Sequence, residues 1–192
     1  MPFESKFSKE SIIDAAFEIA QHEGFKAITA RSVAKRIQGS VAPIYFNFDH
    51  IDDLIHAVVE KVFKISQDIL LEQTSPNLYE NMGKAGFIFA NRYPVFFREL
   101  VLLPNPYLAT YKQIEEAMLE GLKRDPLVAD LTLSEKKMLI FKVKALQIGF
   151  QTMIANHQLP DFMTQTDVEN LFIELGSDLA QLERYKKEKK NE

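Results

Sequence analysis

The stretch TARSVAKRIQGSVAPIYFNF, residues 29–48, decides the fold of this chain. Thr29 is a good helix N-cap, because its hydroxyl can accept a hydrogen bond from an unpaired first-turn amide. Val33, Ala34 and Ile37 recur at helical spacing and predict one apolar stripe. Gly39 is expected to end this first helix at a positive φ, which glycine adopts without a steric clash.

A second short helix is expected after the turn, with Ser40 as its cap. Pro43 falls in the first turn, where no intrahelical amide donor is needed. Helical spacing buries Ile44 and Phe48. The residues expected to face outward are Val41, Ala42, Pro43, Tyr45 and Asn47. Two short helices around a tight turn are the pattern of a helix-turn-helix, whose second helix enters the major groove of DNA.

The charge of this stretch differs from that of the whole chain, which has a formal net charge of -4 at pH 7. Residues 26–48 contain no Asp or Glu, and their cations are Lys26, Arg31, Lys35 and Arg36. A basic island on an acidic protein suits a small phosphate footprint. The alternative interpretation is a solvated helical face that happens to lack acids.

A longer pattern surrounds this stretch and covers about the first third of the chain. Its residues are Ile12-Ile13-Asp14-Ala15-Ala16, Gly24-Phe25, Thr29, Val33-Ala34, Ser40, Ile44-Tyr45-Phe46-Asn47-Phe48 and Leu54. In residue type and spacing the pattern resembles the amino-terminal domain of the TetR family of bacterial transcriptional regulators. The resemblance implies a three-helix DNA-binding domain followed by a helical ligand-binding and dimerisation domain.

The resemblance also implies roles for individual residues. Thr29 and Tyr45 match positions that contact backbone phosphate, and Arg31 matches one that reaches a base or a phosphate. The alternative for Tyr45 is a half-buried aromatic side chain. The complete set expected at DNA is Thr29, Arg31, Lys35, Ser40, Val41, Ala42, Pro43, Tyr45 and Asn47. Asn47 suits phosphate or adenine, whereas the apolar trio at 41–43 suits thymine methyl groups.

Two positions depart from the family pattern. The family usually has glycine one place earlier in the turn, where this chain has Gln38 followed by Gly39. It also commonly has lysine at the start of the fourth helix, where this chain has Ile51. Because one charged phosphate contact is lost, we expect a weaker salt dependence of DNA binding than in a fully basic relative.

Glycine and proline divide the rest of the chain into further helices. They are expected at about 8–23, 49–71, 78–93, 95–103, 107–124, 134–157 and 166–185, with Ser8 and Ser134 as caps and a frayed charged tail at 186–190. The fourth helix is too long to serve the small domain alone. The chain therefore predicts an all-α fold of about nine helices, with a DNA-binding domain at 1–48 and a sensing and dimerisation domain at 49–192.

Composition argues against several other functions. The chain has no Cys, which fits a reducing cytoplasm. The N-terminus lacks the apolar core of a signal peptide, and no run approaches the ~18 apolar residues of a membrane helix. The four histidines, His22, His50, His56 and His157, show no metal-ligand spacing, and no catalytic motif is present. We expect a cytoplasmic protein that is not an enzyme and holds no metal or cofactor.

The second domain is rich in aromatic residues that could line an apolar pocket. The candidate ligand-binding residues are Phe89, Tyr93, Phe97, Tyr111, Met118, Phe141, Gln147 and Phe150. The alternative for each aromatic is a place in the core. The expectation is a repressor that a small, largely apolar effector releases from its operator, and repression is implied by the resemblance alone.

Partners follow from the same resemblance. In the family the last two long helices form a four-helix dimer interface, and here they are expected at about 134–157 and 166–185. Gly149 would allow close helix approach. The alternative is that both helices face a monomer core. The rival function is a small all-α ligand-binding or interaction protein that does not bind DNA. It explains the aromatic half of the chain but not the missing acids at 26–48.

Overall fold

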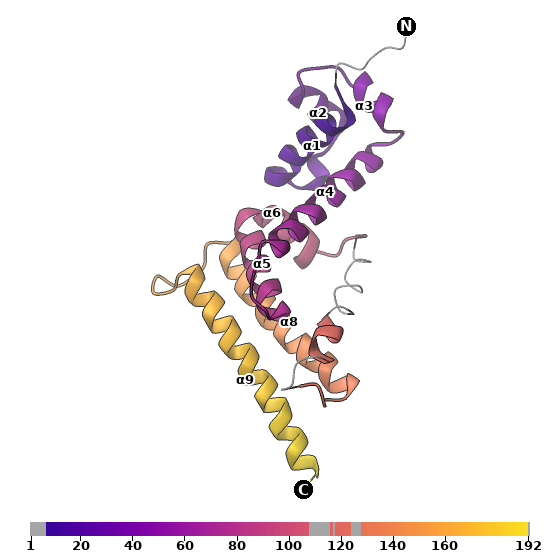
Figure 1. The fold of residues 1–192 in the computed structure, drawn as a ribbon. Helices are drawn as coiled ribbons and strands as arrows, with labels where there is room; N and C mark the ends of the chain where they lie inside the picture. Colours follow the sequence, from indigo (N-terminus) through magenta and orange to yellow (C-terminus); the bar gives the residue numbers. More distant parts are fainter. Residues whose placement is uncertain (1–6, 108–115, 117, 124–127, 192) are drawn as a thin grey trace. The chain divides into compact units, whose positions relative to one another are not determined.

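The computed structural model describes residues 7–107, 116, 118–123 and 128–191 of the chain. Within these ranges the regular elements are all helices, which confirms the all-α expectation (Figure 1). Their contacts form two compact units, residues 1–67 with 93–105 and residues 68–92 with 106–192. This division falls inside the fourth helix rather than at the expected 48/49 boundary. The functional division of the chain stays a prediction.

The first unit contains the helix-turn-helix region. Its elements are α1 (Lys9–Glu23), a 3-10 turn (Phe25–Ala27), α2 (Ala30–Arg36), α3 (Ala42–Asn47), most of α4 (Ile51–Leu71), α6 (Pro94–Phe97) and a π-helical turn (Arg98–Leu102). Ser8 caps α1 as expected, since its hydroxyl oxygen accepts the Ser11 amide at 3.1 Å. Ile12, Ala16 and Ala20 are fully buried at a spacing of four residues, so one face of α1 forms the centre of this core.

The segment 93–105 belongs to the same unit although it follows a helix of the other one. The Phe96 ring lies 5.2 Å from that of Phe17 on α1 and stacks on that of Phe25 at 5.4 Å. Tyr93 meets Phe17 edge-on at 6.1 Å. The glutamate Glu99 accepts the Phe25 amide at 2.8 Å. The end of α1 is therefore held by the segment that returns at residue 93.

The second unit is built on three helices that lie side by side, α5 (Leu78–Arg92), α8 (Leu133–Ala155) and α9 (Gln165–Asn191) (Figure 1). Glycines on α5 permit their close approach. A Cβ at Gly83 would lie 2.3 Å from the Phe172 ring on α9, and one at Gly86 would lie 2.3 Å from the Gln151 amide nitrogen on α8. The core between these helices includes Phe87, Val143 and Phe172.

Two expectations for these helices were wrong. Thr132, not Ser134, caps α8: its hydroxyl accepts the Glu135 amide at 3.3 Å, and the Glu135 carboxylate accepts the Thr132 amide at 2.9 Å. This reciprocal capping box satisfies two amides, which Ser134 cannot do from inside the helix. The tail at 186–190 does not fray, because α9 continues to Asn191.

Ionic contacts account for the longer α9. Lys187 donates to the carboxylate of Asp130 at 2.7 Å, and Lys186 donates to Glu183 at 3.1 Å.

The helix expected at 107–124 is described only in part. Residues 118–123 are helical, Tyr107 lies in a turn, and most of the remainder lies outside the described residues.

By length and composition alone, α8 could cross a membrane, and in the described part of the chain no other helix meets that test. Several of its residues, including Leu139 and Val143, pack in the core of the second unit. This property of α8 is therefore weak support for a membrane span.

Candidate nucleic-acid interface

The first helix of the pair is fixed by the cap that the sequence predicts. The Thr29 hydroxyl accepts the Ser32 amide at 3.0 Å, and the Ser32 hydroxyl accepts the Thr29 amide at 2.9 Å. Val33 and Ala34 are buried beneath α2. Arg31 and Lys35 point to solvent, and within the described residues neither forms an ion pair, so both charges can meet phosphate. Arg36, in contrast, pairs with Glu18 on α1, with its Nε at 2.8 Å from the carboxylate.

The turn after α2 corrects the role expected for Gly39. Gln38, not Gly39, has the positive φ, at 53°. Its amide donates to the Lys35 carbonyl at 3.2 Å, and the Gly39 amide donates to the Ala34 carbonyl at 2.9 Å. These two bonds form a Schellman motif. In this motif the left-handed residue, here Gln38, comes directly before the residue whose amide makes the longer of the two bonds, here Gly39. The left-handed position is therefore the one at which the family usually has glycine.

Gly39 has a different reason to be glycine. A Cβ at this position would lie 2.9 Å from a ring carbon of Phe7. Such an approach is closer than side-chain contacts normally allow. A side chain here would require the Phe7 ring to shift, so space rather than backbone conformation disfavours it.

The second helix, α3, begins one residue later than expected. Val41 is its N-cap, because the amides of Ile44 and Tyr45 both donate to the Val41 carbonyl. Ser40 lies outside the first turn and makes no cap, so that expectation was wrong. Pro43 does lie in the first turn. A six-residue helix without a side-chain cap relies on its packing rather than on its own hydrogen bonds.

That packing comes from the two residues that the sequence places inside. Ile44 is fully buried and Phe48 is nearly so, and both anchor α3 on the core of the first unit. Val41 and Ala42 are exposed, Tyr45 is 54% exposed, and Pro43 and Asn47 are half-buried. The Asn47 amide donates to the Pro43 carbonyl at 2.8 Å, so one of its donors is engaged. The five residues expected to face outward are thus exposed or half-buried, as predicted, whereas their contacts with DNA stay predictions.

Sequence reasoning missed Phe46, which is 70% exposed. The signal was present in the helical phase, because residue 46 lies about 200° around the helix from Ile44 and from Phe48. A residue opposite both buried anchors must face solvent. We name the exposed surface of Val41, Tyr45 and Phe46 the α3 head.

Helix α4 begins beside this head and has negative charge in its first turn. The Asp53 carboxylate accepts the His50 amide at 2.9 Å, which caps the helix start. Ile51 is half-buried, and no cation stands at that position. The weaker salt dependence predicted from Ile51 stays a prediction.

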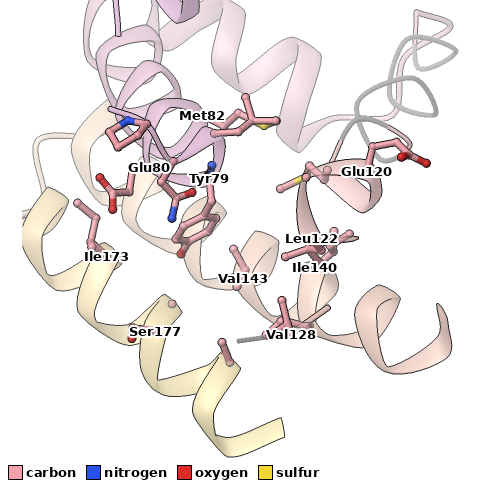
Figure 2. Close-up of a pocket in the computed structure, with 18 residues that line it drawn as sticks. Tyr79, Glu80, Met82, Glu120, Leu122, Val128, Ile140, Val143, Ile173 and Ser177 are labelled. Atoms are coloured by element: carbon pink, nitrogen blue, oxygen red, sulfur yellow. Dashed lines mark hydrogen bonds between the residues drawn. The ribbon is translucent and has the colours of Figure 1, made fainter. Parts of the chain in front are cut away.

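A cavity of about 860 Å³ lies in the second unit. In Figure 2, Tyr79, Glu80 and Met82 line it from α5, while Ile173 and Ser177 line it from α9. The described residues that line it are Pro76, Asn77, Leu78, Tyr79, Glu80, Met82, Met118, Glu120, Gly121, Leu122, Val128, Leu139, Ile140, Val143, Ile173, Gly176, Ser177 and Ala180. Burial and the negative charge of Glu80 raise the pKa of the Tyr79 hydroxyl, which keeps it neutral.

The structure does not gather the eight ligand candidates in this cavity. Met118 lines it, while Gln147 donates to the Met82 carbonyl at 3.3 Å. Phe89 is buried on α5, Phe150 meets Phe87 edge-on at 6.3 Å, and Phe141 is 67% exposed on α8.

The remaining three candidates lie elsewhere. Tyr93 and Phe97 belong to the first unit, and Tyr111 lies outside the described residues. Ligand binding by all eight stays a prediction. Sequence reasoning missed Tyr79 and Glu80, because helical phase cannot distinguish a cavity wall from a packed core.

No three His, Asp or Glu side chains in the described residues lie together in a way that could hold a metal ion. The buried polar atoms there all have partners.

Comparison with known proteins addresses this same region. The model of the family described as "Bacterial regulatory proteins, tetR family" matches residues 12–58, which span α1, α2, α3 and the start of α4. The chain is also 23% identical over 120 residues to "Uncharacterized HTH-type transcriptional regulator YvkB" of Bacillus subtilis (strain 168). That similarity covers 56% of this chain and 63% of the relative, which is less than two thirds of the relative's length. Together with the turned and anchored helix pair, the family match shows that residues 12–58 form a TetR-type helix-turn-helix domain.

Proposed function

We propose that the protein is a DNA-binding transcriptional regulator, a repressor whose hold on its operator is weakened by a small, largely apolar effector. The observation that carries this proposal is the α3 head. Tyr45 and Phe46 point outward from a helix that Ile44 and Phe48 anchor in the core. A short, rigidly anchored helix with exposed side chains suits entry into the major groove.

The side chains around the α3 head suit two kinds of DNA contact, one with the phosphates and one with the bases. Arg31 and Lys35 carry charge to the phosphates, and the exposed Tyr45 hydroxyl can donate to a phosphate oxygen. Val41 and Ala42 present methyl groups, which suit thymine rather than a hydrogen-bonding base edge. Few polar side chains reach for bases, so DNA shape is expected to contribute to specificity.

Binding to an operator calls for two heads about 34 Å apart, because successive major grooves repeat at that distance. We infer a homodimer that joins α8 and α9 of each copy. On α8, Met138, Phe141 and Met153 are 51%, 67% and 43% exposed. On α9, Leu182 and Tyr185 are 44% and 53% exposed. We name these five residues the α8–α9 face.

Effector control would work through a shift between two conformations. A ligand that fits the cavity better in one conformation favours it by its difference in affinity for the two. If that conformation holds the heads at another spacing, affinity for the operator falls, and by linkage the operator weakens ligand binding equally.

The family that residues 12–58 match consists of regulators rather than enzymes, in agreement with the lack of a catalytic motif in the sequence. A cytoplasmic location follows from the same proposed function.

The test is fluorescence anisotropy with DNA fragments that flank the protein's own gene. Wild-type protein is expected to bind one fragment specifically, and Tyr45→Ala to bind it about tenfold more weakly, which is about 1.4 kcal/mol. Phe162→Ala is the matched control, since Phe162 is 84% exposed in the second unit and is not part of the α3 head. Equal binding by wild type and Tyr45→Ala would sink the proposal.

The rival function, an all-α ligand-binding protein that does not meet DNA, rests on the cavity. It predicts that no fragment competes with unrelated DNA for the protein, while ligands still raise its melting temperature.

A further inference from the structure

The cavity of the second unit has the size of a small-molecule site. Its volume of about 860 Å³ falls within the range of ~300–1,000 Å³ that is typical of ligand pockets. Most of its wall is aliphatic or thioether, including Met82, Leu139, Val143 and Ile173. Such a wall favours an apolar body but does not by itself choose among apolar ligands.

The charge of the lining is unbalanced. Among the described residues, the lining contains two carboxylates, Glu80 and Glu120, and no Lys, Arg or His. The two stand at opposite ends of the cavity in Figure 2. A cleft lined by one sign of charge with apolar walls concentrates ligands of the opposite sign.

The two carboxylates are not equivalent. Glu120 is paired with Lys123, and its side chain is 61% exposed, so water and a counter-charge already compensate it. Glu80 is half-buried, and in the described chain it forms no ion pair. Its oxygen accepts the Ser75 hydroxyl at 2.7 Å, which is a neutral donor. Glu80 therefore keeps an uncompensated negative charge at the cavity wall.

The start of α5 does not need the Glu80 carboxylate as its cap. The Tyr79 amide already donates to the Asn77 side chain at 2.9 Å, and the Asn81 amide donates to the Asn77 carbonyl at 3.2 Å. The α5 dipole stabilises a first-turn acid but gives it no direct partner. An oxygen of Glu80 thus stays available to a ligand.

The adjacent Tyr79 side chain is held in a fixed position. Its ring stacks on Phe172 at 4.8 Å, and its hydroxyl donates to the Phe172 carbonyl at 3.3 Å. A Cβ at Gly176 would lie 2.4 Å from the Tyr79 hydroxyl oxygen, so the glycine provides the space for this ring. The wall beside Glu80 is therefore rigid and aromatic, and it supplies no positive charge.

We propose that this cavity binds an amphiphilic molecule with an extended apolar body and a single positive charge, which pairs with the Glu80 carboxylate. The inference names the ligand class of the proposed regulator's sensing site and to that extent rests on the proposed function. An anion of the same shape is rejected, because it would bury its charge beside Glu80. A neutral analogue gains only the apolar contacts.

The test uses three probes with the same decyl chain: decyltrimethylammonium, a neutral decyl oligoethylene glycol ether and decyl sulfate. Isothermal titration calorimetry on the free full-length protein, below the micelle concentration, is expected to rank the affinities cation, neutral, anion. Glu80→Gln is expected to weaken the cation about five- to tenfold and to leave the neutral probe unchanged, because a half-exposed ion pair contributes about 1 kcal/mol.

The controls are Glu120→Gln and Glu188→Gln. Each changes the net charge of the protein by the same amount as Glu80→Gln, so general attraction of cations to an acidic protein changes equally in all three. Glu120 lines the same cavity but is exposed and paired, and Glu188 lies on α9 outside the lining. Glu188→Gln is expected to keep the charge preference of the wild type, and Glu120→Gln to reduce cation affinity less than Glu80→Gln does. The side-chain amide introduced by Glu80→Gln can still accept the Ser75 hydroxyl, so folding is retained, and a melting curve checks it.

Equal affinity for the three probes, or an equal loss of cation affinity in all three variants, overturns the cationic site. The outcome is separable from that of the DNA test. If the protein binds its operator but shows no charge preference among the probes, the regulatory function is supported and the cationic site is excluded. If it binds no DNA but prefers the cation through Glu80, the cationic site is supported and the regulatory function is excluded.

Discussion

At the scale of single residues, two non-glycine positions of the described chain adopt a left-handed backbone. Gln38 has φ 53° after α2 and His157 has φ 54° after α8. Each precedes a residue whose amide bonds back across the helix end, Gly39 to Ala34 at 2.9 Å and Gln158 to Met153 at 2.8 Å. Both helices thus end in a Schellman motif with a side chain at the position that favours glycine.

Gln38→Gly is expected to raise the free energy of unfolding by about 1 kcal/mol, because the crowding of Cβ at positive φ disappears. His157→Gly provides an independent instance in the second unit and should change stability in the same direction. Urea denaturation measures both. Gly39→Ala should do the opposite, since its Cβ would meet the Phe7 ring. A destabilised Gln38→Gly would show that the glutamine side chain makes a contact more important than its backbone strain.

A second feature at the residue scale is the contact of Glu99, in the π-helical turn, with Gly24 and Phe25 at the end of α1. Gly24 has φ 88°, and a Cβ there would lie 2.2 Å from Glu99 Oε1. The other oxygen, Glu99 Oε2, accepts the Phe25 amide at 2.8 Å. The carboxylate therefore fits against a position at which only glycine combines the required backbone conformation with the required space.

Gly24→Ala is expected to cost about 2–3 kcal/mol of stability, since it adds a clash to an unfavourable φ. Glu99→Ala is expected to cost about 1–3 kcal/mol, because the Phe25 amide loses its partner. In the double variant the clash is absent, so Gly24→Ala should cost less than it does in the wild type. Strictly additive costs in thermal or urea unfolding would contradict the proposed fit.

At the scale of elements, the C-terminal part of α9 depends on charge. Glu183 is buried, and its carboxylate pairs with Lys142 on α8 and with Lys186 one turn further along α9. These partners hold the pKa of the Glu183 carboxyl below its usual value, with the hydrogen bond from Lys142 the largest cause. Because the folded pKa is lowered, this contribution is present above the unfolded pKa of about 4.3 and is lost as the pH falls through the folded value.

Glu183→Gln is therefore expected to destabilise the protein by about 1 kcal/mol at pH 7. The difference from wild type should shrink as the pH falls below the unfolded pKa of about 4.3 and should vanish below the lowered pKa of the folded carboxyl. Urea unfolding at several pH values measures the effect. Glu188→Gln serves as the control, since Glu188 pairs with Arg184 at an exposed site and should change stability little. A difference that stays constant down to acid pH would assign the effect to packing instead.

At the scale of the whole molecule, the α8–α9 face is one of the places where the described chain exposes large apolar side chains. Gly149 lies on the exposed side of α8, and a Cβ there would meet no atom within 4 Å. A larger side chain at this position is therefore harmless to one copy alone. Against a second copy it would separate the two helices, because small residues set how closely helices pack.

Phe141→Arg and Gly149→Leu are both expected to shift the protein from a dimer to a monomer of about half the mass, and to lower operator binding with it. Analytical ultracentrifugation measures the first and anisotropy the second. Phe162→Arg, at another exposed aromatic outside the face, should keep the dimer. A wild-type protein that sediments at 22.1 kDa at micromolar concentration would exclude this assembly.

Local signals in the sequence predicted the caps of α1 and α2 and the buried anchors of α3, but not the start of α3, where the expected Ser40 cap is absent. Ser8 and Thr29 act through bonds to amides three residues away, and Ile44 and Phe48 are separated by one helical turn, so both follow from short-range geometry. The exposed Phe46 was equally accessible to this reasoning. The use of Gln38 in place of Gly39 was not, because either residue could end the helix within one position of the other.

What the sequence by itself determined is the all-α architecture, the cap of α2, the buried anchors of α3, and the outward side of α3. These depend on contacts between residues a few positions apart, and the chain encodes them as spacing. Only the tertiary structure decided that Glu99 holds Phe25, that residues 93–105 pack with the first unit, and that Tyr79 and Glu80 border a cavity. Those features join segments that are distant along the chain, and helical periodicity gives the side of a helix that is buried but not the partner that buries it.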